Sequence, residues 1–167
     1  REEQGKIKEF KGKHHFLSNF LLREFEMPAD TDRFDLFGGK PYAVKSAEHI
    51  YQAMKAKDAT AFQSILHMGK PADAKWGGNQ IPIRPDWDDV KVDVMRSILR
   101  AKFRDPELRQ WLLETWPNEL VEGNVWYDDF WGVDEFHGLG GQNWLGRVLM
   151  EVRESLRGEG DAESETA

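Results

Sequence analysis

Apolar residues recur at helical spacing in several segments of this chain, and this pattern limits the folds that the chain can adopt. The clearest segment is 86–104, where Val90, Val94 and Ile98 repeat every four positions along one face. No strand pattern alternates regularly with these segments, as it would in a doubly wound sheet. The sequence therefore predicts an α+β fold that is predominantly α, with a few short strands in the N-terminal third.

Residues that favour helix ends mark where several of the helices begin. Ser46 offers an N-cap to the first helix, and Asp105 followed by Pro106 begins the third, since proline is favoured at the first helical position. Gly69 is a stop signal for the first helix. The expected helices cover residues 46–69, 86–104, 106–115 and about 143–156.

The other segments predict shorter elements. Residues 1–15 read as a lead-in strand or arm, and residues 16–20 as a tight turn. FDLF (34–37) and YAV (42–44) are expected to pair through a hairpin-like turn. Residues 70–85 contain Pro82 and Pro85 and are expected to hold a short helical piece at most.

Length and composition indicate one domain. A chain of 167 residues that is 40% hydrophobic and 12% aromatic buries one sizeable core and is short for two. We expect this domain to cover residues 1–157. The segment GEGDAESETA at 158–167 has no large apolar residue and is expected to be an acidic disordered tail.

The charge and the missing residue types exclude several classes of protein. A net charge of -7 argues against a general nucleic-acid binder, because such binding depends mainly on neutralising phosphates. The lack of cysteine and of any apolar run near ~20 residues favours a cytoplasmic protein without a membrane span. The five histidines have no metal-binding spacing, and no GxSxG or P-loop motif is present, so neither a metal nor a cofactor is expected.

Acidic and aromatic residues concentrate after position 120 and indicate a site for a polar, ring-shaped ligand. Trp126 and Trp131 bracket Asp128 and Asp129. An indole stacks on a planar base, and a carboxylate stabilises the positive charge that develops on a ribose during glycosidic cleavage. The alternative is that both indoles belong to the core and the acids are solvated.

Two further patterns have both a structural and a functional interpretation. The glycine loop at 137–143 leads into a helix, so its amides would hold a phosphate, but glycines also serve sharp turns. Glu48 and Lys55 fall on one helix face beside a buried stripe. They form either a solvated charged face, or a desolvated lysine nucleophile with a carboxylate that moves protons.

Six separated motifs together resemble the NADAR, or YbiA-like, family. They are SNF (18–20), EHIYQAMK (48–55), RPDWDDVKVDVMRSILRAKF (84–103), LVEGN (120–124), DDFWG (128–132) and GQNWLGRVLMEVR (141–153). Each motif is short, but their order and spacing make the joint match specific. The resemblance covers about residues 7–157.

The resemblance implies metal-independent hydrolysis of an N-glycosyl bond to a phosphorylated ribose. One branch of the family hydrolyses phosphorylated riboflavin-pathway intermediates. Another removes ADP-ribose from guanine bases of DNA or RNA and serves as the antidote to a guanine-modifying ADP-ribosyltransferase toxin. We place ADP-ribosyl-guanine first, because a tryptophan-rich wall suits a purine. The alternative of another class is a module that binds ADP-ribose or NAD without catalysis.

The resemblance also implies the roles of individual residues. Lys55 attacks or captures the opened ribose as an imine, while Glu48 and Asp128 handle protons and stabilise the cationic intermediate. The residues expected to bind substrate are Ser18, Asn19, Arg84, Glu122, Asn124, Trp126, Trp131, Gly132, Gly141, Asn143 and Gly146.

The chain departs from the family pattern at one point. After Ala74 and Lys75 the family usually has a Gly-Arg pair, whereas this chain continues WGGN at 76–79. The phosphate contact that this arginine normally provides is therefore expected either from Lys75 or Arg84 or to be missing.

Overall fold

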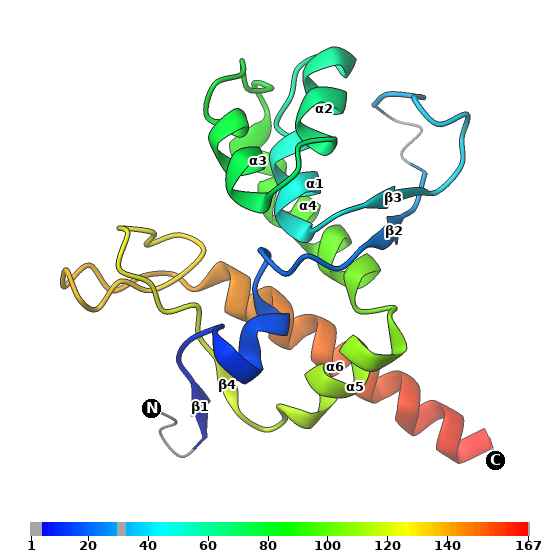
Figure 1. The fold of residues 1–167 in the computed structure, drawn as a ribbon. Helices are drawn as coiled ribbons and strands as arrows, with labels where there is room; N and C mark the ends of the chain where they lie inside the picture. The colour runs from blue at the N-terminus through cyan, green and yellow to red at the C-terminus, as the bar shows by residue number, and fades with distance from the viewer. Residues whose placement is uncertain (1–4, 30–32, 167) are drawn as a thin grey trace. The chain divides into compact units, whose positions relative to one another are not determined.

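The computed structural model describes residues 5–29 and 33–166, and the chain divides into two compact units. One unit is Asn19–Lys102, and the other joins Arg1–Ser18 to Phe103–Ala167. Helices predominate over short strands in each unit (Figure 1). The predicted α+β class, weighted towards α, is confirmed.

In the unit Asn19–Lys102, a short helix is buried on every side. Helix α1 (Ala47–Ala53) begins after Ser46, whose side chain accepts a hydrogen bond from the His49 N–H, so the predicted N-cap is confirmed. All seven residues of α1 are buried. The elements that pack against it are α2 (Ala59–Leu66), α3 (Pro71–Gly78), α4 (Trp87–Lys102) and strand β3 (Tyr42–Val44).

The single helix predicted over residues 46–69 is wrong, because the chain leaves the helix after Ala53 and forms α2 separately. Asp58 begins the second helix, since its carboxylate accepts from the Ala61 N–H at 2.8 Å. Between the two helices, Ala56 forms a bridge with Ile83, which is distant in sequence. A local cap and a distant backbone partner together override the helical propensity of the segment.

The hairpin predicted between residues 34–37 and 42–44 is also wrong. Residues 42–44 form β3 as expected, but its antiparallel partner is β2 (Phe25–Met27). Phe37 instead stacks flat on Tyr42, with ring centroids 4.3 Å apart. Residues 34–37 therefore contribute aromatic packing rather than backbone pairing.

In the other unit, two helices frame the core. Helix α5 (Pro106–Glu114) begins after Asp105, whose side chain accepts from two backbone N–H groups as predicted. Helix α6 (Trp144–Thr166) packs against α5 and against strand β4 (Glu119–Leu120). Strand β1 (Lys6–Ile7) pairs with β4 in parallel and leads to the 3-10 helix η1 (Gly12–Leu17), which ends where the Ser18 N–H donates to His15 O.

Helix α6 extends into residues 158–166, most of the segment for which an acidic disordered tail is expected. The helix continues to Thr166, and its side chains are exposed from Gly158 onward. Ion pairs support it, because Arg157 lies 2.7 Å from Glu154 and Arg109 of α5 lies 3.6 Å from Glu159. Ala167 lies outside the described residues. No helix in the described part of the chain is long and apolar enough to cross a membrane.

Lys102 predicts an unusual dependence of stability on pH. It lies buried at the end of α4, and this burial lowers its pKa to about 7. The unfolded chain keeps the ordinary pKa near ~10.4, so it binds more protons than the folded chain between the two values. The free energy of unfolding should therefore rise by up to ~4 kcal/mol as the pH increases from about 7 to about 10.

Urea unfolding across this pH range measures the effect in wild type and in Lys102→Met. The variant should be more stable than wild type below about pH 7 and should lose most of the slope, because methionine releases no proton. Lys57→Met, which removes an exposed lysine, should keep the wild-type slope. The same slope in Lys102→Met as in wild type would contradict the assignment.

Candidate functional site

The polar face of α1 is buried rather than solvated. Glu48 is 6% exposed and Gln52 is 3% exposed. The Gln52 Nε2 donates to Glu48 Oε1 at 2.7 Å, which fixes the carboxylate. The Glu48 N–H donates to Asn19 O, and this bond places Asn19 beside the first turn of α1. Within residues 5–29 and 33–166, Asn19 Oδ1 finds no hydrogen-bond donor although it is buried, so a ligand N–H or O–H would satisfy it.

Lys55 lies just beyond the end of α1 and is half-buried. Its Nζ is 5.2 Å from the centre of the Tyr51 ring. Burial lowers the pKa of Lys55 below its ordinary value, Glu48 raises it, and the charges of Lys75 and Lys91 lower it further. At a given pH, more of this amine is therefore neutral and nucleophilic than for an exposed lysine.

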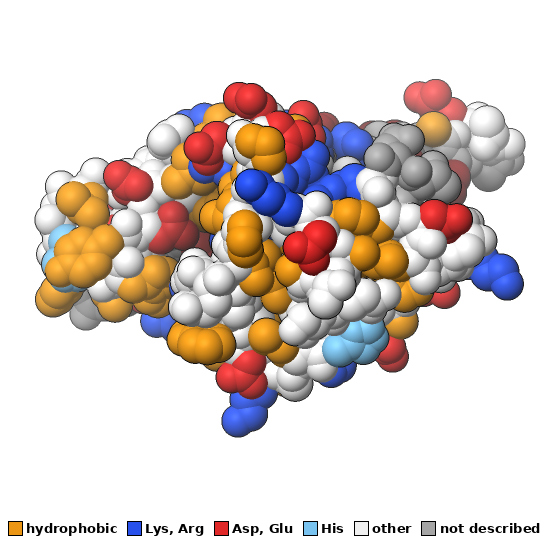
Figure 2. Space-filling model, turned by 90° about the horizontal axis from the view of Figure 1, so that it is seen from above, with side chains coloured by type: hydrophobic (Ala, Val, Ile, Leu, Met, Phe, Trp, Pro, Cys, Tyr) orange, Lys and Arg blue, Asp and Glu red, His pale blue; other side chains and the backbone are white. Residues whose placement is uncertain are grey.

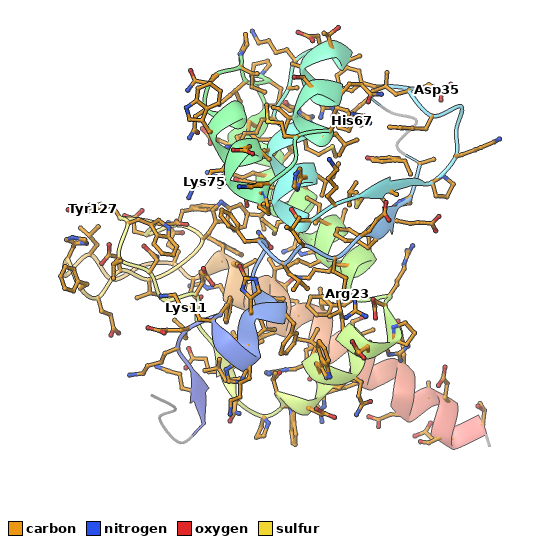
Figure 3. The ribbon with its side chains drawn as sticks, in the orientation of Figure 1. Lys11, Arg23, Asp35, His67, Lys75 and Tyr127 are labelled. Carbon is orange, nitrogen blue, oxygen red and sulfur yellow. The ribbon has the colours of Figure 1, made fainter. Side chains whose placement is uncertain are left out.

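The two candidates for the phosphate contact differ in their surroundings. Arg84 makes two bonds to the Asp86 carboxylate, at 2.5 and 2.7 Å, so a phosphate would have to compete with this carboxylate. Lys75, labelled on α3 in Figure 3, lies with its Nζ 5.8 Å from the centre of the Phe20 ring. With Lys91 of α4, it brings positive charge close to Lys55.

In the other unit, Asn124 and Asp128 hold the loop that follows β4. Asn124 Oδ1 accepts from the N–H groups of Trp126 and Asp128, and its Nδ2 donates to Asp128 O at 2.8 Å. Asp128 Oδ1 in turn accepts from the N–H groups of Phe130 and Trp131, at 3.1 and 2.9 Å. Both side chains therefore shape the loop on which the predicted site residues lie.

Asp134 is a buried carboxylate in this loop that no sequence pattern predicted. It accepts from the N–H groups of Tyr127 and His137, and its Oδ2 lies 2.8 Å from His137 Nδ1. Burial alone would raise the pKa of Asp134, but these hydrogen bonds hold it below its ordinary value. The sequence Asp-Glu-Phe-His at 134–137 contains no pattern that would indicate a buried, hydrogen-bonded carboxylate. In the described residues, no three histidine or acidic side chains meet in a group suited to a metal ion.

The tip of the same loop exposes large apolar side chains. They are Val125, Trp126, Tyr127, Phe136 and Leu139. Figure 2 shows hydrophobic side chains beside a histidine at its left edge, and Figure 3 labels Tyr127 on this side. Trp126 is 48% exposed, so the alternative that it belongs to the core is wrong. Trp131 is half-buried and meets Phe130 edge-on, with ring centroids 4.9 Å apart. The exposed rings offer faces on which a planar ligand could stack.

The amides at the end of the glycine loop and at the start of α6 are used within the chain. The N–H groups of residues 142–145 donate to carbonyl oxygens of residues 129–132 at 2.8 to 3.3 Å. The phosphate interpretation of this loop is therefore wrong for these amides, because the chain itself already uses the donors that an anion would need.

Internal packing accounts for four residues that the resemblance places in the substrate site. A Cβ atom on Gly132, Gly141 or Gly146 would lie only 2.1 to 2.3 Å from a backbone oxygen of another segment. Asn143, with a φ of 54°, donates to Leu120 O and accepts from the Glu122 N–H. These residues join β4, the loop and the start of α6.

Three comparisons with known proteins agree. The family model described as NADAR domain matches residues 7–157. The chain is 37% identical over 150 residues to "N-glycosidase YbiA" of Escherichia coli (strain K12), covering 85% of this chain and 92% of that protein. The NMR structure of the E. coli protein YbiA superposes with a TM-score of 0.74 at 34% identity, covering 94% of this chain and 88% of that chain.

A second kind of relative is longer. "Riboflavin biosynthesis protein PYRR, chloroplastic" of Zea mays is 32% identical over 164 residues, covering 89% of this chain and 24% of that protein. This chain thus resembles about a quarter of that protein.

The packing of Gln52 predicts that Gly78 cannot be replaced without loss. A Cβ on Gly78 would lie 1.9 Å from Gln52 Oε1 and 2.8 Å from its Cδ. Gly78→Ala should therefore displace Gln52 from Glu48 and lower the free energy of unfolding by ~1–3 kcal/mol. Thermal unfolding measures the loss. Gly69→Ala is the matched control, since a Cβ there meets nothing within 4 Å.

A double-variant cycle tests the cause. In a Gln52→Ala background, Gly78→Ala should cost much less, because the atoms that it displaces are gone. An equal cost in both backgrounds would assign the effect to the backbone of α3 instead.

The neighbours of Lys55 predict opposite shifts of its pKa. Lys75→Met should raise the pKa, since a like charge is removed, and Glu48→Gln should lower it, since an opposite charge is removed. The rate at which Lys55 reacts with an acylating reagent, followed by peptide mass spectrometry against pH, reports the pKa without any substrate. Lys57→Met should leave it unchanged, and a shift in the same direction for both test variants would refute the assignment.

Proposed function

Because this chain belongs to the NADAR family, we propose that it hydrolyses the N-glycosyl bond between a phosphorylated ribose and a nitrogen atom. One observation carries the proposal: the half-buried amine of Lys55, whose pKa is lowered by burial, lies within electrostatic reach of the buried Glu48. A desolvated amine beside a carboxylate is suited to nucleophilic attack with proton transfer. The name N-glycosidase, which the E. coli relative carries, supports this bond type.

In the proposed reaction, a proton first passes from the Lys55 ammonium to the Glu48 carboxylate, and the neutral amine then forms a bond to C1′ of the ribose. The bond between C1′ and the leaving nitrogen breaks, its electron pair passes to that nitrogen, and the carboxylic acid of Glu48 protonates it. When the ribose ring opens, the bond between C1′ and the ring oxygen breaks, one proton of the lysine nitrogen passes to that oxygen and the other to the Glu48 carboxylate, which leaves an imine on Lys55. Water then adds to C1′, releases the sugar phosphate and restores the amine.

The first candidate substrate is a phosphoribosylamino-pyrimidine of the riboflavin pathway. The Zea mays relative supports this candidate, because a riboflavin biosynthesis protein contains a region similar to this chain. The substrate carries a phosphate, and Lys75 and Lys91 place positive charge near Lys55 where a phosphate would be held.

The second candidate is guanine that carries ADP-ribose in DNA or RNA, the substrate that the tryptophan-rich sequence favours. The exposed Trp126, Tyr127 and Phe136 favour it, since nucleobases stack on such rings. With this substrate, the chain would act as the antidote to a guanine-modifying ADP-ribosyltransferase toxin.

A side-by-side incubation separates the candidates. Wild type is given the phosphoribosylamino-pyrimidine and, separately, a guanine-ADP-ribosylated oligonucleotide, and released ribose 5-phosphate or ADP-ribose is measured. Lys55→Ala should abolish release, and Glu48→Gln should lower kcat by ~10²–10⁴-fold. Lys57→Ala, which changes an exposed lysine two positions on, should retain wild-type activity.

Borohydride trapping tests the covalent step. Wild type incubated with its substrate and borohydride should gain a ribose adduct on Lys55. If borohydride traps no adduct on Lys55 of the wild type and Lys55→Ala keeps full activity, the imine is excluded. Release from neither substrate, together with a thermal shift by ADP-ribose, would identify a binding module instead.

A further inference from the structure

Three consecutive backbone carbonyls around Lys55 are held by residues from other loops. Arg33 Nη1 donates to Met54 O at 2.7 Å, and its Nη2 donates to Ala56 O at 2.5 Å. Between them, Lys55 O accepts from the Arg84 N–H at 2.8 Å. The guanidinium of Arg33 thus spans the residue that carries the amine, one carbonyl on each side.

The end of α1 explains why this segment needs such partners. The helix stops at Ala53 and α2 begins at Ala59, so no following helical turn provides N–H groups for the carbonyls of residues 54–56. A guanidinium is a planar fork with several donors, and it bonds two acceptors without much loss of freedom. The ring of Phe34 lies under Arg33, 4.8 Å from its Cζ, and supports it.

The geometry points to Arg33 as a positioning residue for Lys55. It contributes no atom to the reaction, but it fixes the backbone from which the amine projects. Misplacement of a reacting group by about 1 Å can lower a rate ~10²-fold, so a contact of this kind controls kcat rather than substrate affinity. This inference rests on the proposed function, because it requires Lys55 to be the reacting amine.

The test compares adduct formation on two lysines of one protein. Purified protein is incubated with ribose 5-phosphate and cyanoborohydride, and peptide mass spectrometry gives the ratio of adduct on Lys55 to adduct on the exposed Lys57. In Arg33→Met this ratio should fall about tenfold or more, and kcat should fall with little change in KM. Arg33→Lys retains one donor group and should restore part of both. If Arg33 had a merely structural role, its replacement would lower stability without lowering the adduct ratio and without a selective loss of kcat.

Asp35 provides the matched control. It belongs to the same loop, where it is labelled in Figure 3, and its Oδ1 accepts from the Gly39 N–H at 2.7 Å rather than bonding to the backbone of residues 54–56. Asp35→Asn should therefore keep the wild-type ratio and kcat. If Arg33→Met does not fold, Arg33→Lys carries the test with the same readouts.

The outcomes distinguish this inference from the proposed function. A wild-type adduct on Lys55 with an unchanged ratio and kcat in both Arg33 variants would overturn the positioning role and leave the lysine mechanism intact. An equal loss in Asp35→Asn would also overturn it, since the loop as a whole would then be responsible. A wild type without any excess of adduct on Lys55 would overturn the lysine mechanism and the positioning role together.

Discussion

The burial of α1 on every side is the constraint on which the unit Asn19–Lys102 depends. A helix with no solvated face needs partners inside the protein for its polar side chains, because an unsatisfied buried group costs about 1–3 kcal/mol. His49 does so by contacts with Ser46 Oγ at 2.6 Å and Met68 O at 2.9 Å, and burial lowers its pKa, which favours a neutral ring. Glu48 does so through Gln52. The same burial that demands these partners gives Glu48 and Lys55 the low polarity that their proposed chemistry uses.

Much of the helical content could be predicted because its signals are local. The N-caps Ser46 and Asp105 and the apolar period of α4 depend only on neighbouring residues, and all three lie where they were expected. The break at residues 54–58 could not be predicted in the same way. It depends on Ile83 and Arg33, which reach this segment from distant loops, and helical period carries no information about such partners.

In the candidate site, too, the features with local sequence signals could be predicted and those that depend on distant partners could not. Helix geometry places Glu48 and Lys55 on one face, and the structure adds that Glu48 and its partner Gln52 are buried. The glycines were harder to interpret, because a glycine before a helix has the same sequence signal whether it admits an anion or another backbone. At Gly132, Gly141 and Gly146 the neighbouring atom is a carbonyl oxygen of the chain itself. The buried Asp134 had no signal at all, since its donors are brought to it by the turn of the loop.

The loop after β4 is closed at its base by its own backbone. The Asn124 N–H donates to Val133 O, the Asp134 N–H donates to Gly140 O, and the amides at the start of α6 are tied to residues 129–132. The side chains at its tip therefore carry little of the stability of the unit, although they form much of its exposed apolar surface. The outer residues of such a loop can diverge, or be exchanged by an engineer, without a change of fold.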